Sequence, residues 1–143
     1  MKNNDIDSLK ENKVHGSSDY PLHIYSYIDK SGNYFVTHHW HKEIELIYIE
    51  RGDMILTVNK NNYNLHEGEF YLMNIEQMHS ISGVTPSLHH AIIFNPNILD
   101  FNMFDITQNE IIQKFTSGKF MFPDTNEFDS EPVSYTHLTL PTT

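Results

Sequence analysis

Histidine and glutamate residues gather in this sequence in a pattern that suits metal or ligand binding. His39, His41 and Glu45 lie close together, and His79 follows downstream. Imidazole nitrogens and carboxylate oxygens are ligands that first-row divalent ions accept, and three histidines with one glutamate leave positions open for water or a substrate. The same side chains could also hydrogen-bond a polar ligand without any metal.

A strand conformation would bring three of these side chains together. Successive side chains of a strand point to opposite faces, so residues 39, 41 and 45 would lie on the same side of a sheet. Glu43 has the same parity. The period of two therefore leaves both glutamates open as ligands.

Short β-rich runs separated by turn residues must position these groups. Many short strands at close spacing indicate a sandwich or a barrel. The third run is apolar on both faces, which predicts a central, covered strand. Turns are expected at residues 31–33, 51–53, 60–62 and 67–68. The runs are Tyr25–Tyr27, Tyr34–Thr37, Glu43–Glu50, Met54–Val58, Phe70–Met73, Met78–Ile81 and Ala91–Phe94.

A single helix is expected after the last strand. Thr107-Gln108-Asn109-Glu110 has the pattern of a capping box, and Gly118 fits a helical stop. Ile111, Ile112 and Phe115 would form its apolar face. The sequence predicts about three turns of helix.

Two segments resemble the motifs of the cupin family. His39-x-His41-x3-Glu45-x6-Gly52 resembles the first motif, and Gly68-x10-His79 resembles the second. Cupins usually carry proline and glycine where this chain has Asn74 and Glu76, and asparagine where it has Gly83. The resemblance implies a mostly β fold, a cupin-type double-stranded β-barrel (jelly roll) with a C-terminal helix. It also favours Glu45 over Glu43.

Residues 20–123 resemble, more broadly, the N-terminal domain of AraC-type transcription regulators. The weaker part of this resemblance runs through Ile92-Ile93-Phe94-Asn95-Pro96 and the helix to Phe122-Pro123. It implies a domain that binds a small-molecule effector, often a sugar, and dimerises in the full-length protein. It implies no enzyme activity, and DNA would be bound only through a C-terminal helix-turn-helix domain that this chain lacks.

The resemblance places the ligand-binding pocket at His39, His41, Glu45 and His79. No cofactor is required for this role, and a divalent transition metal at the same four residues remains an alternative. Other functions that stay open are a cupin metalloenzyme (dioxygenase, isomerase or epimerase) and a stand-alone sugar-binding module. His38, His66, His89 and His90 are expected on the surface, and Trp40 against the core.

Composition excludes several other classes. A net charge of −10, from 9 basic and 19 acidic residues, provides no basic stripe for phosphate groups. Cysteine is absent. The polar start has no signal-peptide pattern, and no run approaches the roughly 18 apolar residues of a membrane span. We therefore expect a cytoplasmic protein with no membrane partner.

Three segments are expected along the chain. Residues 1–19 are polar and predict a flexible N-terminal arm, which in sugar-responsive relatives covers the pocket. Residues 20–131 would form the cupin effector-binding and dimerisation domain. Residues 132–143 are interpreted as an artefact, because Val133 to Thr142 matches the translation of a transposase-derived sequencing adapter.

Overall fold

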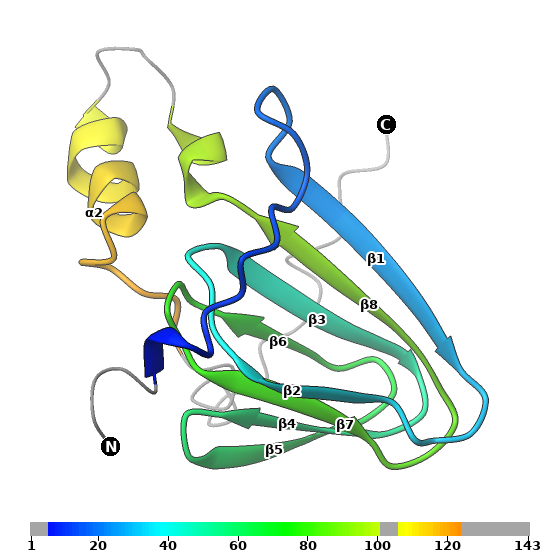
Figure 1. The fold of residues 1–143 in the computed structure, drawn as a ribbon. Coiled ribbons are helices and arrows are strands. Elements are labelled where there is room, and N and C mark those ends of the chain that lie inside the picture. Colours follow the sequence, from blue (N-terminus) through cyan, green and yellow to red (C-terminus); the bar gives the residue numbers. More distant parts are fainter. Residues whose placement is uncertain (1–5, 101–105, 124–143) are drawn as a thin grey trace, which may run out of the picture.

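Two antiparallel sheets of four strands form the molecule in the computed structural model, which describes residues 6–100 and 106–123 (Figure 1). The first sheet has the order β1-β8-β3-β6 and the second has the order β2-β7-β4-β5. The mostly β, two-sheet barrel predicted from the sequence is confirmed. The strands are β1 Leu22–Asp29, β2 Phe35–His39, β3 Ile44–Arg51, β4 Met54–Val58, β5 Asn61–Leu65, β6 Phe70–Met73, β7 His79–Gly83 and β8 Ser87–Phe94.

The core lies between the two sheets. Met54, Leu56 and Val58 alternate along β4 and are buried, as are Ile47 and Ile49 on the odd-numbered face of β3. Each such side chain contributes roughly 1.5–3 kcal/mol when fully buried. The interior packing therefore fixes which face of each strand points into the barrel.

The prediction that β3 is both central and covered was half right. β3 pairs with β6 and with β8, so it is central. Its outer face is open, because Leu46 is only half-buried and Tyr48 is exposed. With Ile24, Phe70 and Ile92 these side chains line a shallow apolar groove on the outside of the sheet. A strand whose sequence is apolar on both faces can thus leave one of those faces open to solvent.

The strand β5 was missed. Residues 60–62 were expected to be a turn, yet Asn61 and Asn62 pair with Val58 and Thr57 of β4. The actual reversal is at Asn59, which has a positive φ of 55°. β5 is an edge strand, where pairing with a neighbour overrides the poor strand propensity of asparagine.

The C-terminal helical region is present, but the predicted capping box is not. A short 3₁₀ helix, η1 (Pro96–Leu99), precedes a helix made of a π-helical part, η2 (Gln108–Ile112), and α2 (Gln113–Thr116). Thr107 already has helical φ and ψ and its side chain makes no capping bond, so there is no capping box. Ile111 is 52% exposed and buries little apolar surface. Gly118 ends the helix at a φ of 74°, as predicted.

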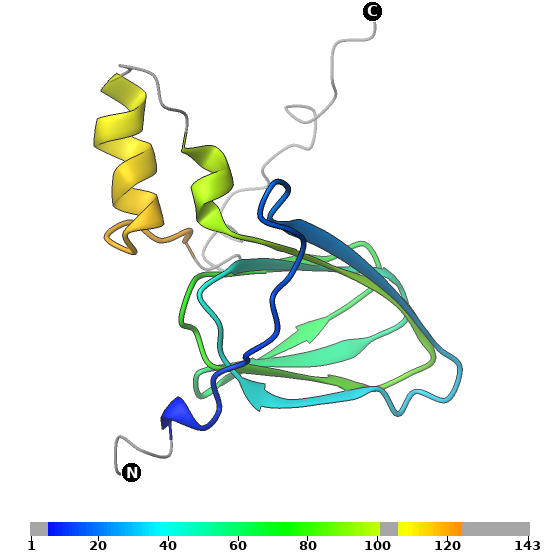
Figure 2. The ribbon, with the colours of Figure 1, turned by 45° about the horizontal axis from the view of Figure 1, so that its top comes forward.

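The segment from residue 6 to residue 19 crosses one open end of the barrel (Figures 1 and 2). Lys10 forms a β-bridge with Trp40, and the Trp40 indole N–H donates to the Ile6 carbonyl at 2.8 Å. Trp40 is half-buried under this arm, so the prediction that it packs in the core was wrong. The adapter-like residues 132–143 and residues 1–5 lie outside the described part of the chain.

Candidate ligand and metal site

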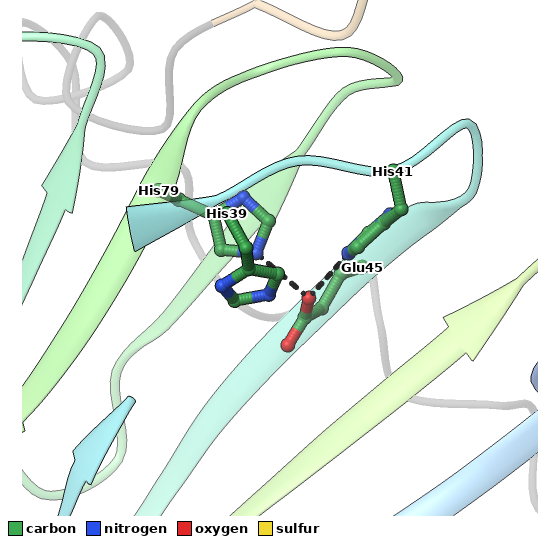
Figure 3. Close-up of side chains that lie close together, drawn as sticks. All are labelled: His39, His41, Glu45 and His79. Carbon is green, nitrogen blue, oxygen red and sulfur yellow. Dashed lines mark hydrogen bonds and ion pairs between the residues drawn. The ribbon is translucent and has the colours of Figure 1, made fainter. Parts of the chain in front are cut away.

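The four predicted site residues come together at one point near the arm (Figure 3). One nitrogen or oxygen atom from each of His39, His41, Glu45 and His79 lies within 4.8 Å of the others. They do not share a strand. His39 ends β2 in one sheet, Glu45 lies on β3 in the other, and His41 is in the connection between them. The parity argument was therefore wrong, and a crossover between sheets brings the side chains together.

Glu45 is the centre of the cluster. One of its carboxylate oxygens, Oε2, lies 3.0 Å from Nε2 of His41 and 3.1 Å from Nε2 of His79. His39 packs beside His79, with 4.2 Å between the ring centroids. Glu43, the alternative, instead approaches His15 of the arm at 3.8 Å. Geometry thus puts Glu45, and not Glu43, among the three histidines.

The second nitrogen of each histidine ring faces a main-chain carbonyl. The Nδ1 atoms of His39, His41 and His79 lie 2.8, 3.0 and 2.8 Å from the carbonyl oxygens of Thr37, Glu43 and Gln77, respectively. A carbonyl oxygen only accepts, so each Nδ1 must carry the proton. In a neutral ring the inward-facing Nε2 then carries no hydrogen and can only accept a hydrogen bond.

An Nε2 without a hydrogen and a carboxylate oxygen both accept hydrogen bonds and repel each other. The short contacts from Glu45 to His41 and His79 therefore require positive charge at the centre. Protons on the two rings would supply it, and so would a cation between the ligand atoms.

Electrostatics agree with a charged cluster. Burial by itself would raise the pKa of Glu45, but the hydrogen bonds from His41 and His79 outweigh burial and lower the pKa to about 2. Burial works against protonation of His41, yet the hydrogen bond and charge of Glu45 raise its pKa. Burial and the charge of His79 lower the pKa of His39. Glu45 is therefore ionised, and its hydrogen bond with His41 favours the protonated form of that ring.

The donor set fits a divalent transition metal. Three imidazole nitrogens and one carboxylate oxygen suit zinc, iron, manganese or nickel, and the carbonyl bonds to Nδ1 are the usual outer support of metal-binding histidines. His39, His41, Glu45 and His79 would hold such an ion. When bound, the ion would polarise an oxygen atom of a ligand in the adjoining cavity.

A cavity of about 90 Å³ leads from the cluster into the barrel. Aromatic side chains line it: Tyr25, Tyr27, Tyr34 and His89. The arm closes it with Glu11, Lys13 and His15. The interior therefore offers stacking surfaces together with hydroxyl and imidazole groups.

His89 lines this cavity, and its prediction as a surface residue was wrong. It is 2% exposed and packs between the rings of Tyr27 and Tyr34, with centroid distances of 5.2 and 4.4 Å. Its Nδ1 lies 3.3 Å from Oγ of Ser87, whereas its Nε2 has no hydrogen-bond partner among the described residues. Burial, helped by the charge of His90, lowers the pKa of His89 to about 4, so the ring is neutral.

Sequence alternation along β8 did not single out His89. Ser87, His89, Ala91 and Ile93 share the inward face, but the opposite face carries Leu88, Ile92 and Phe94 and is at least as apolar. His15 gave no signal either, because it lies in a polar arm. It is buried, with Nδ1 2.8 Å from the hydroxyl of Tyr25 and Nε2 3.3 Å from Glu11.

The fold is that of a cupin. A cupin protein (BF4112) from Bacteroides fragilis superposes with a TM-score of 0.50, at 17% identity over 57% of this chain and 72% of that one. KdgF from Halomonas gives a TM-score of 0.49 at 17% identity, covering 57% of this chain and 76% of that one. Among the described residues no helix has the length and apolarity to cross a membrane.

Family membership is more specific. Residues 21–115 match the AraC-like ligand binding domain, and the chain belongs to that family. A relative in Bacillus subtilis, the "Uncharacterized HTH-type transcriptional regulator YdeC", is 32% identical over 81 residues, which are 55% of this chain and 28% of that protein. The chain thus matches less than a third of the length of this relative. An effector-binding regulatory domain is the function class that the family and the relative support.

Proposed function

We propose that this chain is the effector-binding and dimerisation domain of an AraC-type regulator of transcription. The observation that carries the proposal is the cavity inside the barrel of a chain that belongs to a family of ligand-binding domains, with a polar cluster at one end and the arm across it. DNA would be bound by a helix-turn-helix domain beyond residues 20–131. In this proposal residues 1–19 form the N-terminal arm and residues 132–143 are an adapter-derived artefact.

The ligand-contacting groups in this proposal are His39, His41, Glu45 and His79. His89 joins them, because a ligand hydroxyl or carboxyl group could pair with its buried Nε2 and relieve the cost of a buried polar atom without a partner. Such groups suit a small oxygenated molecule, with or without a metal ion at the cluster.

The size of the cavity bears on the choice of effector. At about 90 Å³ the cavity is smaller than the roughly 150 Å³ cavity that holds one benzene molecule, so a sugar ring needs more room than it offers. A sugar would have to displace Glu11, Lys13 or His15 of the arm, whereas a small hydroxy acid would fit with less movement. Sugar binding would therefore change the position of the arm. Such a change could alter a dimer contact and the geometry of the DNA-binding domains.

A metal-dependent cupin enzyme is the second candidate. It is favoured by one observation, the metal-ready geometry of the four-residue cluster. Turnover of a sugar or a small acid by the metal-loaded chain would support it over the regulator.

Binding measurements test the proposed function. Thermal shifts would be recorded with a panel of pentoses, hexoses and small hydroxy acids, and bound metal would be measured by elemental analysis after dialysis against Zn²⁺. We expect binding that His41→Ala abolishes and His66→Ala preserves, because His66 is exposed and its contacts with Asp53 and Glu69 lie at the surface. Binding that survives His41→Ala, or no binding of any probe, would contradict the proposal.

A further inference from the structure

The loop between β6 and β7 connects the ligand site with the segment that follows the C-terminal helix. It consists of residues 74–78, directly before His79. The segment after α2, residues 119–123, runs back from the helix to this part of the barrel (Figure 1). The loop therefore touches two regions that are far apart in the sequence.

On the pocket side, the loop holds two of the four cluster residues. The Gln77 carbonyl lies 2.8 Å from Nδ1 of His79 and accepts a hydrogen bond from its N–H. The Glu76 main-chain N–H donates to the His41 carbonyl, also at 2.8 Å. A shift of either histidine thus acts on the loop through a direct hydrogen bond.

On the other side, the Asn74 side chain forms two hydrogen bonds with the main chain of Phe122 in the segment after the helix. We call this pair of bonds the Asn74–Phe122 clip. Oδ1 of Asn74 accepts from the main-chain N–H of Phe122 at 2.7 Å, and its Nδ2 donates to the carbonyl of the same residue at 3.0 Å. Asn74 is 7% exposed, so water competes poorly for these two bonds. Ile75 packs against the helix end, since a Cβ atom built on Gly118 would lie 3.1 Å from its Cδ1.

Within the loop, the two sides are tied together. The Asn74 N–H donates to the Gln77 side-chain oxygen at 2.8 Å, and the Gln77 N–H approaches the Asn74 carbonyl at 3.4 Å. Glu76 has a φ of 63°, a conformation that non-glycine residues rarely adopt. Since the bond to His41 helps to hold this conformation, release of that bond gives the loop a more relaxed alternative.

We propose that the β6–β7 loop transmits the state of the pocket to residues 119–123 through the Asn74–Phe122 clip. The inference rests on the proposed function, because it describes how a change in the ligand site would reach the part of the protein that follows the helix. Asn74 is a positioning residue here: it touches no ligand and holds the outgoing chain. The cupin pattern has proline at this position, which could form neither side-chain bond.

Hydrogen exchange at the Phe122 amide tests the clip in the intact 143-residue chain. Asn74→Ala removes the acceptor, and we expect exchange about five- to tenfold faster, as for loss of typical hydrogen bonds. Asn74→Asp keeps the acceptor for the Phe122 N–H but puts an oxygen in place of the donor to the Phe122 carbonyl, so it should also speed exchange. Asn62→Ala, which removes a side-chain bond to Thr57 on the far strand, should leave Phe122 unchanged. Exchange that does not respond to Asn74→Ala would overturn the clip.

A substitution in the pocket tests whether the pocket is coupled to residues 119–123. His79→Ala should speed exchange at Phe122 at least twofold, and this effect should disappear in the Asn74→Ala background. The buried Leu56 amide of β4 reports global unfolding, so equal acceleration at Leu56 and Phe122 would count against the coupling. An unchanged Phe122 amide in His79→Ala would also overturn it, even if sugars, acids or Zn²⁺ bind. Conversely, a response at Phe122 without binding of any probe would leave the coupling in place and refute the proposed function.

Discussion

Replacing His89 by phenylalanine should make the protein more resistant to acid. Burial and the charge of His90 hold the pKa of His89 at about 4 in the folded state, against 6.5 for an ordinary histidine in the unfolded chain. As the pH falls below 6.5 the unfolded state takes up a proton that the folded state refuses until about pH 4. The contribution of neutral His89 to the free energy of unfolding is therefore complete above pH 6.5 and is lost progressively as the pH falls toward 4.

The magnitude follows from the two pKa values. Between pH 7 and pH 5 the difference in proton binding corresponds to a loss of about 2 kcal/mol in the free energy of unfolding. Phenylalanine keeps an aromatic ring between Tyr27 and Tyr34 and has no group to protonate. The variant should lose about 2 kcal/mol less than the wild type over the same range.

Urea unfolding at the two pH values measures this difference, with the fluorescence of Trp40, the single tryptophan, as the probe. His66→Ala is the matched control. His66 is exposed and its pKa is raised by the hydrogen bond to Asp53, so its contribution has the opposite sign, being present below pH 6.5 and lost as the pH rises. Equal losses in wild type and His89→Phe would refute the assignment of His89 as a buried, neutral histidine.

Three further predictions concern the cluster, the turns and the arm. Glu45→Gln removes the charge that raises the pKa of His41, so an NMR titration should show a lower pKa; an unchanged value would contradict the pairing. Gly52→Ala should destabilise far more than Gly68→Ala, because both glycines have positive φ but only a Cβ at Gly52 would clash with the Pro86 carbonyl oxygen, whereas Gly68 faces open space. We expect about 1 kcal/mol for Gly68→Ala and roughly 3 kcal/mol or more for Gly52→Ala in thermal unfolding, and similar losses would disprove the steric argument. Trp40→Phe removes the bond to Ile6 and should speed proteolysis within residues 6–19; equal cleavage rates would show that this bond does not hold the arm.

The fold was predictable because the motif glycines and the alternating strands are local signals. Met54, Leu56 and Val58 alternate with less buried neighbours and read directly as a strand. β5 carries asparagines and forms only because β4 offers a pairing edge, which is a tertiary effect that propensity does not contain.

The convergence of the four candidate residues was predictable from the sequence, but its geometry was not. Family resemblance pointed to Glu45, while strand parity treated residues 39 to 45 as one strand and missed the crossover between sheets. His15 and His89 were missed for different reasons. His15 is buried only by tertiary contacts of a polar arm, whereas His89 lies on a strand that is apolar on both faces, so alternation did not show which face points inward.

The open apolar groove on the outside of the first sheet has a consequence for the behaviour of the protein in solution. Ile24 and Phe70 are 57% and 45% exposed there, and contact between two such surfaces would release ordered water. The net charge of −10 opposes that contact by mutual repulsion. Because salt screens the repulsion and leaves the apolar attraction intact, light scattering should report more self-association as the ionic strength rises. Storage at low ionic strength would then keep the chain monodisperse.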